Sequence, residues 1–154
     1  MKLRTTAFLA ALAGALSACV TVDSGEPMSY ARKCASSPCD VSVSTGNFGI
    51  FWVTVTLTDR TLDLNGQKSV KWIVTEPGYQ FADNGISFIA KQGGRDPAGV
   101  FACVKSADSL SFTCDVNEQK TGYYGYSVRL AGPKDVLPYE AWIKLGDARF
   151  DRKP

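Results

Sequence analysis

Histidine is the residue type that most limits the chemistry of this 154-residue sequence, because the chain contains none. Ser-His-Asp and Cys-His nucleophiles both need an imidazole to take up the proton of the attacking group. Histidine-ligated zinc and blue copper, which has two histidine ligands, are excluded for the same reason. We therefore expect neither a metal nor a cofactor.

Acidic residues and Ser-Lys pairs are the remaining candidates for catalysis. No Ser-x-x-Lys motif occurs after residue 19. A pair of carboxylates could act as general acid and base, but the aspartates that could form one fall at expected turns or strand ends, where acidic residues commonly serve turn geometry. These are Asp83, Asp96, Asp108 and Asp115. We predict that the protein is not an enzyme.

One segment partly resembles a calcium-binding loop. Asp63-Leu64-Asn65-Gly66 resembles half of an EF-hand loop. Thr61 stands two positions before Asp63, and Trp72 occupies the position of the bidentate glutamate, so the match fails on both sides. Asn-Gly is instead a strong hairpin signal. The sequence therefore predicts a hairpin turn here and no metal site.

Aromatic side chains are the best candidates for contacts with a partner. Alternation places Tyr124 and Tyr126 on the same face as the apolar positions that follow them, which leaves Tyr123 and Trp52 for the outer side. Exposed tyrosine and tryptophan favour interfaces because they combine a large contact area with a polar group. Trp52 and Tyr123 are therefore the candidate interface residues.

The first eighteen residues have the zones of a secretory signal. Lys2 and Arg4 precede an apolar run, Ala7 to Leu16, and the small residues Ser17 and Ala18 follow it. As a helix, ten residues would span about 15 Å, which is half of the roughly 30 Å hydrocarbon core of a bilayer. The run is too short for a stable transmembrane helix.

The tetrad Leu16-Ser17-Ala18-Cys19 stands directly after this run and resembles the lipobox of bacterial lipoproteins. The resemblance covers about the first nineteen residues. It implies cleavage before Cys19, a diacylglyceryl thioether on that cysteine and an acylated N-terminus, and two or three acyl chains anchor a protein permanently. In similar lipoproteins an aspartate after the cysteine favours the inner membrane. Val20 follows here, so the outer membrane is the expected location.

Four cysteines remain once Cys19 is assigned to lipid, and they can pair in three ways. Export delivers them to an oxidising compartment. We favour Cys34 with Cys39 and Cys103 with Cys114, because the second pair lies on two apolar runs separated by a turn-like segment, although loop entropy alone does not choose. The spacing within each pair is neither the two-residue spacing of thioredoxin-type motifs nor that of zinc ligands.

Loss of the signal also removes Lys2 and Arg4, which leaves fifteen basic residues against fifteen acidic ones. The mature chain is formally neutral, and no basic stripe remains to bind nucleic acid. We expect no nucleic-acid partner.

The sequence pattern divides the chain into three parts. Residues 1–18 form the signal, residues 19–33 are expected to form a polar, lipid-anchored tether, and residues 34–154 are expected to form one domain. Period-two alternation after Cys39 predicts strands, among them Ile50 to Leu57, and a second turn is predicted at Asp83-Asn84-Gly85. The expected fold is all-β: a single antiparallel β-sandwich, immunoglobulin-like or cupredoxin-like, of about eight strands.

The segment from Trp72 to Ile143 loosely resembles small exported β-sandwich proteins of proteobacteria that are mostly uncharacterised, and this resemblance carries no activity over. We hypothesise a non-catalytic envelope lipoprotein that binds a protein partner, or serves a structural role, through loop ends or an open sheet edge. The alternative is an inhibitor or immunity lipoprotein that neutralises a periplasmic wall-degrading or toxic enzyme. A glycan-binding module ranks below both.

Overall fold

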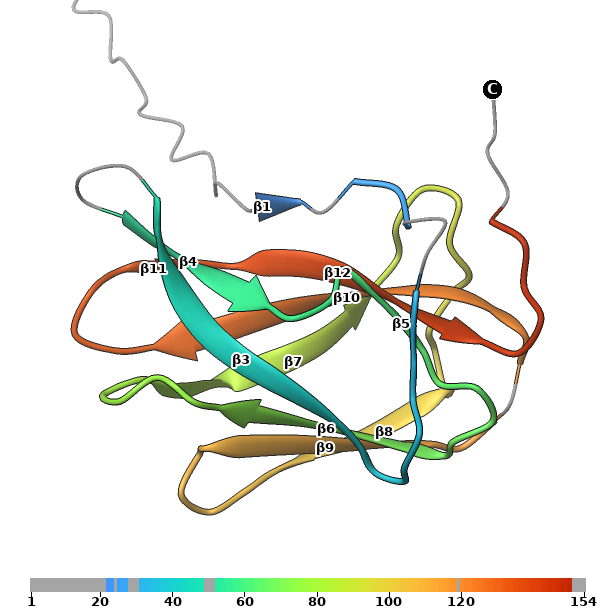
Figure 1. The fold of residues 1–154 in the computed structure, drawn as a ribbon, viewed down its shortest axis with the longest axis horizontal. Helices are drawn as coiled ribbons and strands as arrows, with labels where there is room; N and C mark the ends of the chain where they lie inside the picture. The colour runs from blue at the N-terminus through green and yellow to red at the C-terminus, as the bar shows by residue number, and fades with distance from the viewer. Residues whose placement is uncertain (1–21, 24, 28–30, 49–51, 119, 151–154) are drawn as a thin grey trace, which may run out of the picture.

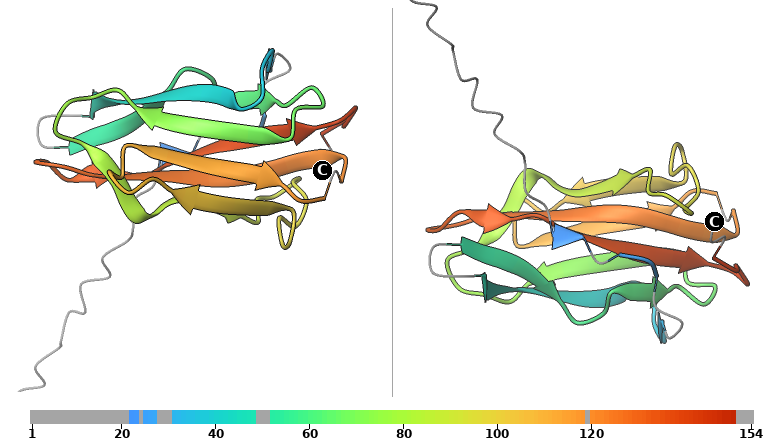
Figure 2. Two further views of the ribbon diagram at one scale, coloured as in Figure 1. Left: turned by 90° about the horizontal axis from the view of Figure 1, so that it is seen from below. Right: turned by 90° about the horizontal axis from the view of Figure 1, so that it is seen from above.

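The computed structural model describes residues 22–23, 25–27, 31–48, 52–118 and 120–150 (Figure 1). All regular secondary structure within these ranges is β-strand, which confirms the all-β class predicted from the period-two pattern. Within the same ranges, no helix is long and apolar enough to cross a membrane. Two sheets lie face to face, as the paired views in Figure 2 show.

Each sheet has six strands. The first has the order β2-β5-β12-β10-β7, with β1 also paired to β12, and it contains β1 (Val22–Asp23), β2 (Arg32–Lys33), β5 (Thr61–Asp63), β7 (Gln80–Ile89), β10 (Gly122–Ala131) and β12 (Tyr139–Leu145). The second has the order β11-β4-β3-β6-β9-β8, and it contains β3 (Cys39–Phe48), β4 (Trp52–Leu57), β6 (Ser69–Val74), β8 (Phe101–Lys105), β9 (Ser111–Val116) and β11 (Val136–Leu137).

The expected antiparallel sandwich of about eight strands is wrong in strand number and in strand direction. Half of the ten strand pairs among the described residues are parallel, including the central pair β3–β6. A parallel pair needs a crossover connection, because a short hairpin can join only antiparallel strands. The chain passes from one sheet to the other at several connections, and alternation alone does not reveal which strands then become neighbours.

The turn at Asn65-Gly66 illustrates this point. Both residues have positive φ, 48° and 83°, as an Asn-Gly turn requires. The hairpin prediction is nevertheless wrong, because β5 belongs to the first sheet and β6 to the second. Asp63 holds the turn: its carboxylate accepts the N–H of Asn65 at 2.9 Å and lies 3.2 Å from the Lys144 ammonium.

The second predicted turn, at residues 83–85, is also wrong, because these residues lie inside the continuous strand β7. Its register against β10 shifts there: Phe81 pairs with Leu130 and Ile86 with Val128. Four residues of β7 therefore stand opposite one residue of β10 and form an irregular bulge. Turn-forming residues in a strand can mark such a bulge as well as a chain reversal.

The core lies between the inner faces of the sheets. Val53 and Val55 of β4 are buried, and Thr56 is exposed, as the alternation predicted. Tyr124 and Tyr126 of β10 are fully buried, again as predicted. Trp72 of the second sheet packs against Tyr126 of the first, with ring centroids 5.2 Å apart, so the largest side chains join the two layers.

Part of the segment expected to form a tether is instead in the first sheet. Strand β1 pairs in parallel with β12, Val22 with Tyr139 and Asp23 with Glu140. Strand β2 pairs in parallel with β5. These residues pack on the domain, and only positions 20 and 21 separate Cys19 from β1.

Two disulfides join the cysteine pairs that the sequence favoured, Cys34–Cys39 and Cys103–Cys114. The first connects the end of β2 to the start of β3. The second joins directly opposite residues of the β8–β9 hairpin. The first link therefore joins the two sheets, the second joins paired strands, and both close short loops.

Candidate functional site

A hollow of about 690 Å³ opens between the two sheets, on the side where β4 lies next to β5 and β12. We call it the threonine groove, and its lining consists of Arg32, residues 54–61 and Tyr139. Its floor and walls thus come from both sheets and from the connection between β4 and β5. We call the side of the domain that carries this groove the open side; strands β4, β5 and β12, which contribute to its lining, are labelled in Figure 1.

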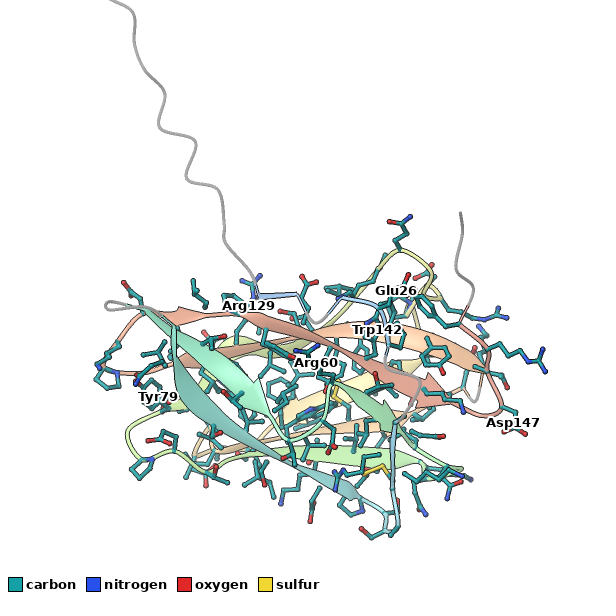
Figure 3. All side chains as sticks on the ribbon, turned by 45° about the horizontal axis from the view of Figure 1, so that its top comes forward. Glu26, Arg60, Tyr79, Arg129, Trp142 and Asp147 are labelled. Atoms are coloured by element: carbon teal, nitrogen blue, oxygen red, sulfur yellow. A yellow bond between two sulfur atoms is a disulfide. The ribbon has the colours of Figure 1, made fainter. Side chains whose placement is uncertain are left out.

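The groove presents hydroxyl and guanidinium groups. Thr54, Thr56, Thr58 and Thr61 supply the hydroxyls. Arg32 is held in place, since its Nε lies 2.7 Å from a carboxylate oxygen of Asp59 and its Nη2 donates to the carbonyl of Asp40 at 2.6 Å. Arg60 is exposed and makes no salt bridge with any described residue. Figure 3 shows it on the side of the domain that is turned forward.

One wall of the groove is a sheet edge that is only partly covered. On one side, every residue of β4 is paired with β3. On the other side, β11 pairs only with Val53 and Thr54. The N–H of Val53 donates to the carbonyl of Asp135 on that outer side, at 3.3 Å. Successive main-chain N–H groups of a strand point to alternate sides. The N–H groups of Val55 and Leu57 therefore point to the same outer side as that of Val53. The pairing of Leu137 with Thr54 uses the Val55 N–H as a donor to the Leu137 carbonyl, and no described strand pairs with the Leu57 N–H.

Pro138 ends β11 at this point, and the chain then enters β12 in the other sheet. The open edge is therefore bounded by a residue that cannot continue the ladder, because proline lacks an N–H. The Val55 carbonyl accepts a hydrogen bond from the neighbouring Thr54 hydroxyl, at 3.3 Å. The Val55 carbonyl and the Leu57 N–H thus lie beyond the β11 pairing and remain for an added strand.

Two buried aromatic residues bear polar atoms without partners near the groove. The Tyr126 hydroxyl and the Trp72 indole nitrogen have no hydrogen-bond partner among the described residues. Burial raises the pKa of Tyr126 above its usual value, and the Trp72 indole beside the hydroxyl offsets part of this rise.

A second hollow, of about 620 Å³, lies where loop residues 92–95 and the start of β10 meet the segment after β12. We call it the arginine cleft, and its lining consists of residues 92–95, 121–123 and 147–149. Arg95 and Arg149 are exposed and form no salt bridge with a described residue. A Cβ on Gly122 would lie 2.7 Å from Cδ of Arg95, so only glycine lets that side chain cross the strand.

No known protein family matches this chain. A search of curated proteins likewise finds no similar sequence. Among the described residues, no group of three or more histidines, cysteines and acidic side chains could hold a metal ion. The candidate site therefore rests on the geometry of the two hollows.

The predicted site residues fall in different places. Tyr123 lines the arginine cleft, where its ring meets Phe150 edge to face at 5.5 Å and its carbonyl accepts the N–H of Arg95. Trp52 begins β4, the strand that borders the threonine groove, and its side chain lies outside what the structure describes. Tyr123 lies in the first sheet and Trp52 in the second. Cys19 lies outside the described residues.

The threonine groove was missed by sequence reasoning. Its signal was visible as the alternation of Thr54, Thr56 and Thr58 with apolar residues. That pattern indicates one polar face of a strand. It does not show that the strand has an open edge, because edge position depends on which strands pair with it.

Proposed function

We propose that the protein is a non-catalytic, lipid-anchored envelope protein that binds an extended segment of a partner protein in the threonine groove. The observation that carries the proposal is the edge of β4 that β11 leaves uncovered, at the Val55 carbonyl and the Leu57 N–H. A partner strand added there would continue the line of β11. Such β-augmentation gains affinity from main-chain hydrogen bonds and specificity from side-chain contacts.

The side chains around the edge favour a particular partner chemistry. Arg60 offers an exposed guanidinium without a salt-bridge partner among the described residues, which would complement an acidic residue on the added strand. The threonine hydroxyls can both donate and accept hydrogen bonds. A polar, acidic, extended segment is therefore the partner that fits best.

The lipobox-like tetrad supports the proposed location. On this proposal residues 1–18 are removed, Cys19 carries the lipid, and Val20 after it favours the outer membrane over the inner. The two disulfides are consistent with an oxidising envelope compartment.

A photo-crosslinking amino acid at Thr56 tests the proposal in native cells. Thr56 is exposed and lines the groove, whereas Val104 is 71% exposed on the opposite edge strand, β8, and serves as the matched control. We expect a discrete protein adduct from position 56 that position 104 does not give. Identical adducts from both positions, or none from position 56, would contradict the proposal.

The arginine cleft supports one alternative, an inhibitor or immunity protein acting on a wall-degrading or toxic enzyme. Its two guanidinium groups would complement the paired carboxylates of a glycoside hydrolase. Cells lacking the protein would then become sensitive to lysozyme, and wild-type protein but not the R95E/R149E variant would restore resistance. Full restoration by the variant would exclude this use of the cleft.

A further inference from the structure

The distance between the proposed lipid and the folded domain is short. Strand β1 begins at Val22, three residues after Cys19. Even a fully extended chain spans only about 11 Å over three residues. The polar segment after Cys19, expected from sequence to hold the domain away from the lipid, contributes little separation.

Two contacts hold the N-terminal segment on the domain. Val22 and Asp23 are in register with Tyr139 and Glu140 of β12. Farther along, the indole N–H of Trp142 donates to the carbonyl of Gly25 at 2.6 Å, and Trp142 is only 1% exposed. The view from above in Figure 2 shows β1 lying across the outside of the domain on this side.

The same contacts place β1 next to the threonine groove. Tyr139 pairs with Val22 and also lines the groove. Since paired strands lie about 4.8 Å apart, the Tyr139 end of the groove is within about 16 Å of the Cα atom of Cys19. The headgroup layer on each side of a bilayer is itself about 5–8 Å thick.

We infer that the open side of the domain lies on the lipid surface, and that the threonine groove takes an extended segment adjoining the membrane anchor of another envelope protein. This inference rests on the proposed function. A segment at headgroup level can reach a groove that faces the membrane, whereas a soluble globular partner would be blocked by the bilayer. The opposite edge, β8, is four strands away from β4 in the second sheet and faces the aqueous side.

The first test measures the orientation of the whole acylated protein. It is reconstituted in vesicles of phosphatidylethanolamine and phosphatidylglycerol that carry a nitroxide on some headgroups, with a fluorescent amino acid at Thr56 or at Val104. We expect quenching to be several-fold stronger at position 56. Insertion of twenty Gly and Ser residues between Thr21 and Val22, which adds a mean span of about 25 Å, should reduce it to the level at position 104.

Equal quenching at the two positions would overturn the inference, and so would quenching at position 56 that the insertion leaves unchanged. The mass of the mature chain separates this failure from failure of the proposed function. If Cys19 carries no lipid, the proposed anchoring and the inference both fall. If it is lipidated and quenching is equal, only the inference falls.

The second test identifies the partner segment. Peptide mapping of the Thr56 adduct should place the crosslinked residue within about ten residues, or roughly 35 Å of extended chain, of a lipidated cysteine or a membrane-spanning segment. An adduct with a partner that has no membrane anchor would overturn the inference but leave the proposed groove intact.

Discussion

The indole N–H of Trp142 donates a hydrogen bond to the carbonyl of Gly25, which lies 117 positions earlier in the chain. The ring is buried outside the main core, where Phe150 packs edge to face against it at 5.3 Å and the Lys91 ammonium lies 5.0 Å from its centroid. Lys91 in turn pairs with Glu140 at 3.3 Å. Trp142 thus fastens the N-terminal segment to the outer face of the first sheet.

Replacement of Trp142 by phenylalanine should release this fastening while keeping an aromatic ring. Loss of the hydrogen bond is expected to cost about 1 kcal/mol of unfolding free energy. Hydrogen exchange at the amides of Val22 and Asp23 should accelerate selectively. The control is Trp72→Phe, because the Trp72 indole nitrogen has no hydrogen-bond partner among the described residues. Equal acceleration in both variants would show that the bond to Gly25 does not hold β1.

The sequence was sufficient to predict strands and their buried faces because alternation reports burial directly. Val53, Val55, Tyr124 and Tyr126 are all buried as expected. The cysteine pairing followed from proximity along the chain, since Cys103 and Cys114 lie on the two strands of a true hairpin.

Topology could not be predicted in the same way. Leu62 and Leu64 precede the Asn65-Gly66 turn, and Val70 and Trp72 follow it, in a pattern that also fits a hairpin. The chain instead changes sheets, because β5 pairs with β12 from the far end of the sequence. The open edge of β4 depends on such long-range pairing, so the candidate site was hidden for the same reason.

Alkaline pH should destabilise the domain through Tyr126. Burial raises the pKa of its phenol, so the folded state keeps the proton after the unfolded chain, with a pKa near 10, has begun to lose it. The stability contribution is therefore complete below about pH 10 and is lost as pH rises above it. Tyr126→Phe should flatten this alkaline loss in urea-unfolding measurements made between neutral and alkaline pH.

At neutral pH, Tyr126→Phe should lower the free energy of unfolding only slightly, because the Tyr126 hydroxyl has no hydrogen-bond partner among the described residues. Tyr124→Phe is the matched comparison. The Tyr124 hydroxyl donates to the carbonyl of Lys120 at 2.7 Å, and its loss should cost about 1 kcal/mol. A larger cost for Tyr126→Phe than for Tyr124→Phe would show that the Tyr126 hydroxyl is bonded after all.

The two disulfides should contribute unequally to stability. They close loops with sequence separations of 11 and 5. Loop entropy predicts a loss of about 3 kcal/mol for C103A/C114A and about 2 kcal/mol for C34A/C39A. Denaturant unfolding of the two double variants measures the difference, and peptide mapping of the oxidised wild type checks the pairing. A mapped Cys34–Cys103 link would refute the assignment.

Acid should weaken the turn between β8 and β9 through Asp108. The Ser106 hydroxyl and the Leu110 N–H both donate to its carboxylate, and they hold its pKa below the usual value. A carboxyl group whose pKa is lower in the folded state stabilises the fold at pH values above its unfolded pKa, which is near 3.9. This stabilisation disappears as the pH falls through the folded pKa. Asp108→Asn should therefore make stability less dependent on pH below about 4. An unchanged acid profile would mean that these hydrogen bonds do not persist in solution.

Reversal of the charge at Arg60 should weaken partner binding without weakening the fold. Arg60 lines the threonine groove, is exposed and has no salt bridge with a described residue, so Arg60→Glu should change the unfolding free energy by no more than about 0.5 kcal/mol. The new carboxylate would repel an acidic partner strand, and the yield of the Thr56 adduct should fall several-fold. Arg129→Glu is the control, because Arg129 is also exposed but does not line the groove; Figure 3 labels both residues. An equal loss of adduct in the two variants would point to a general electrostatic effect and would remove Arg60 from the recognition site.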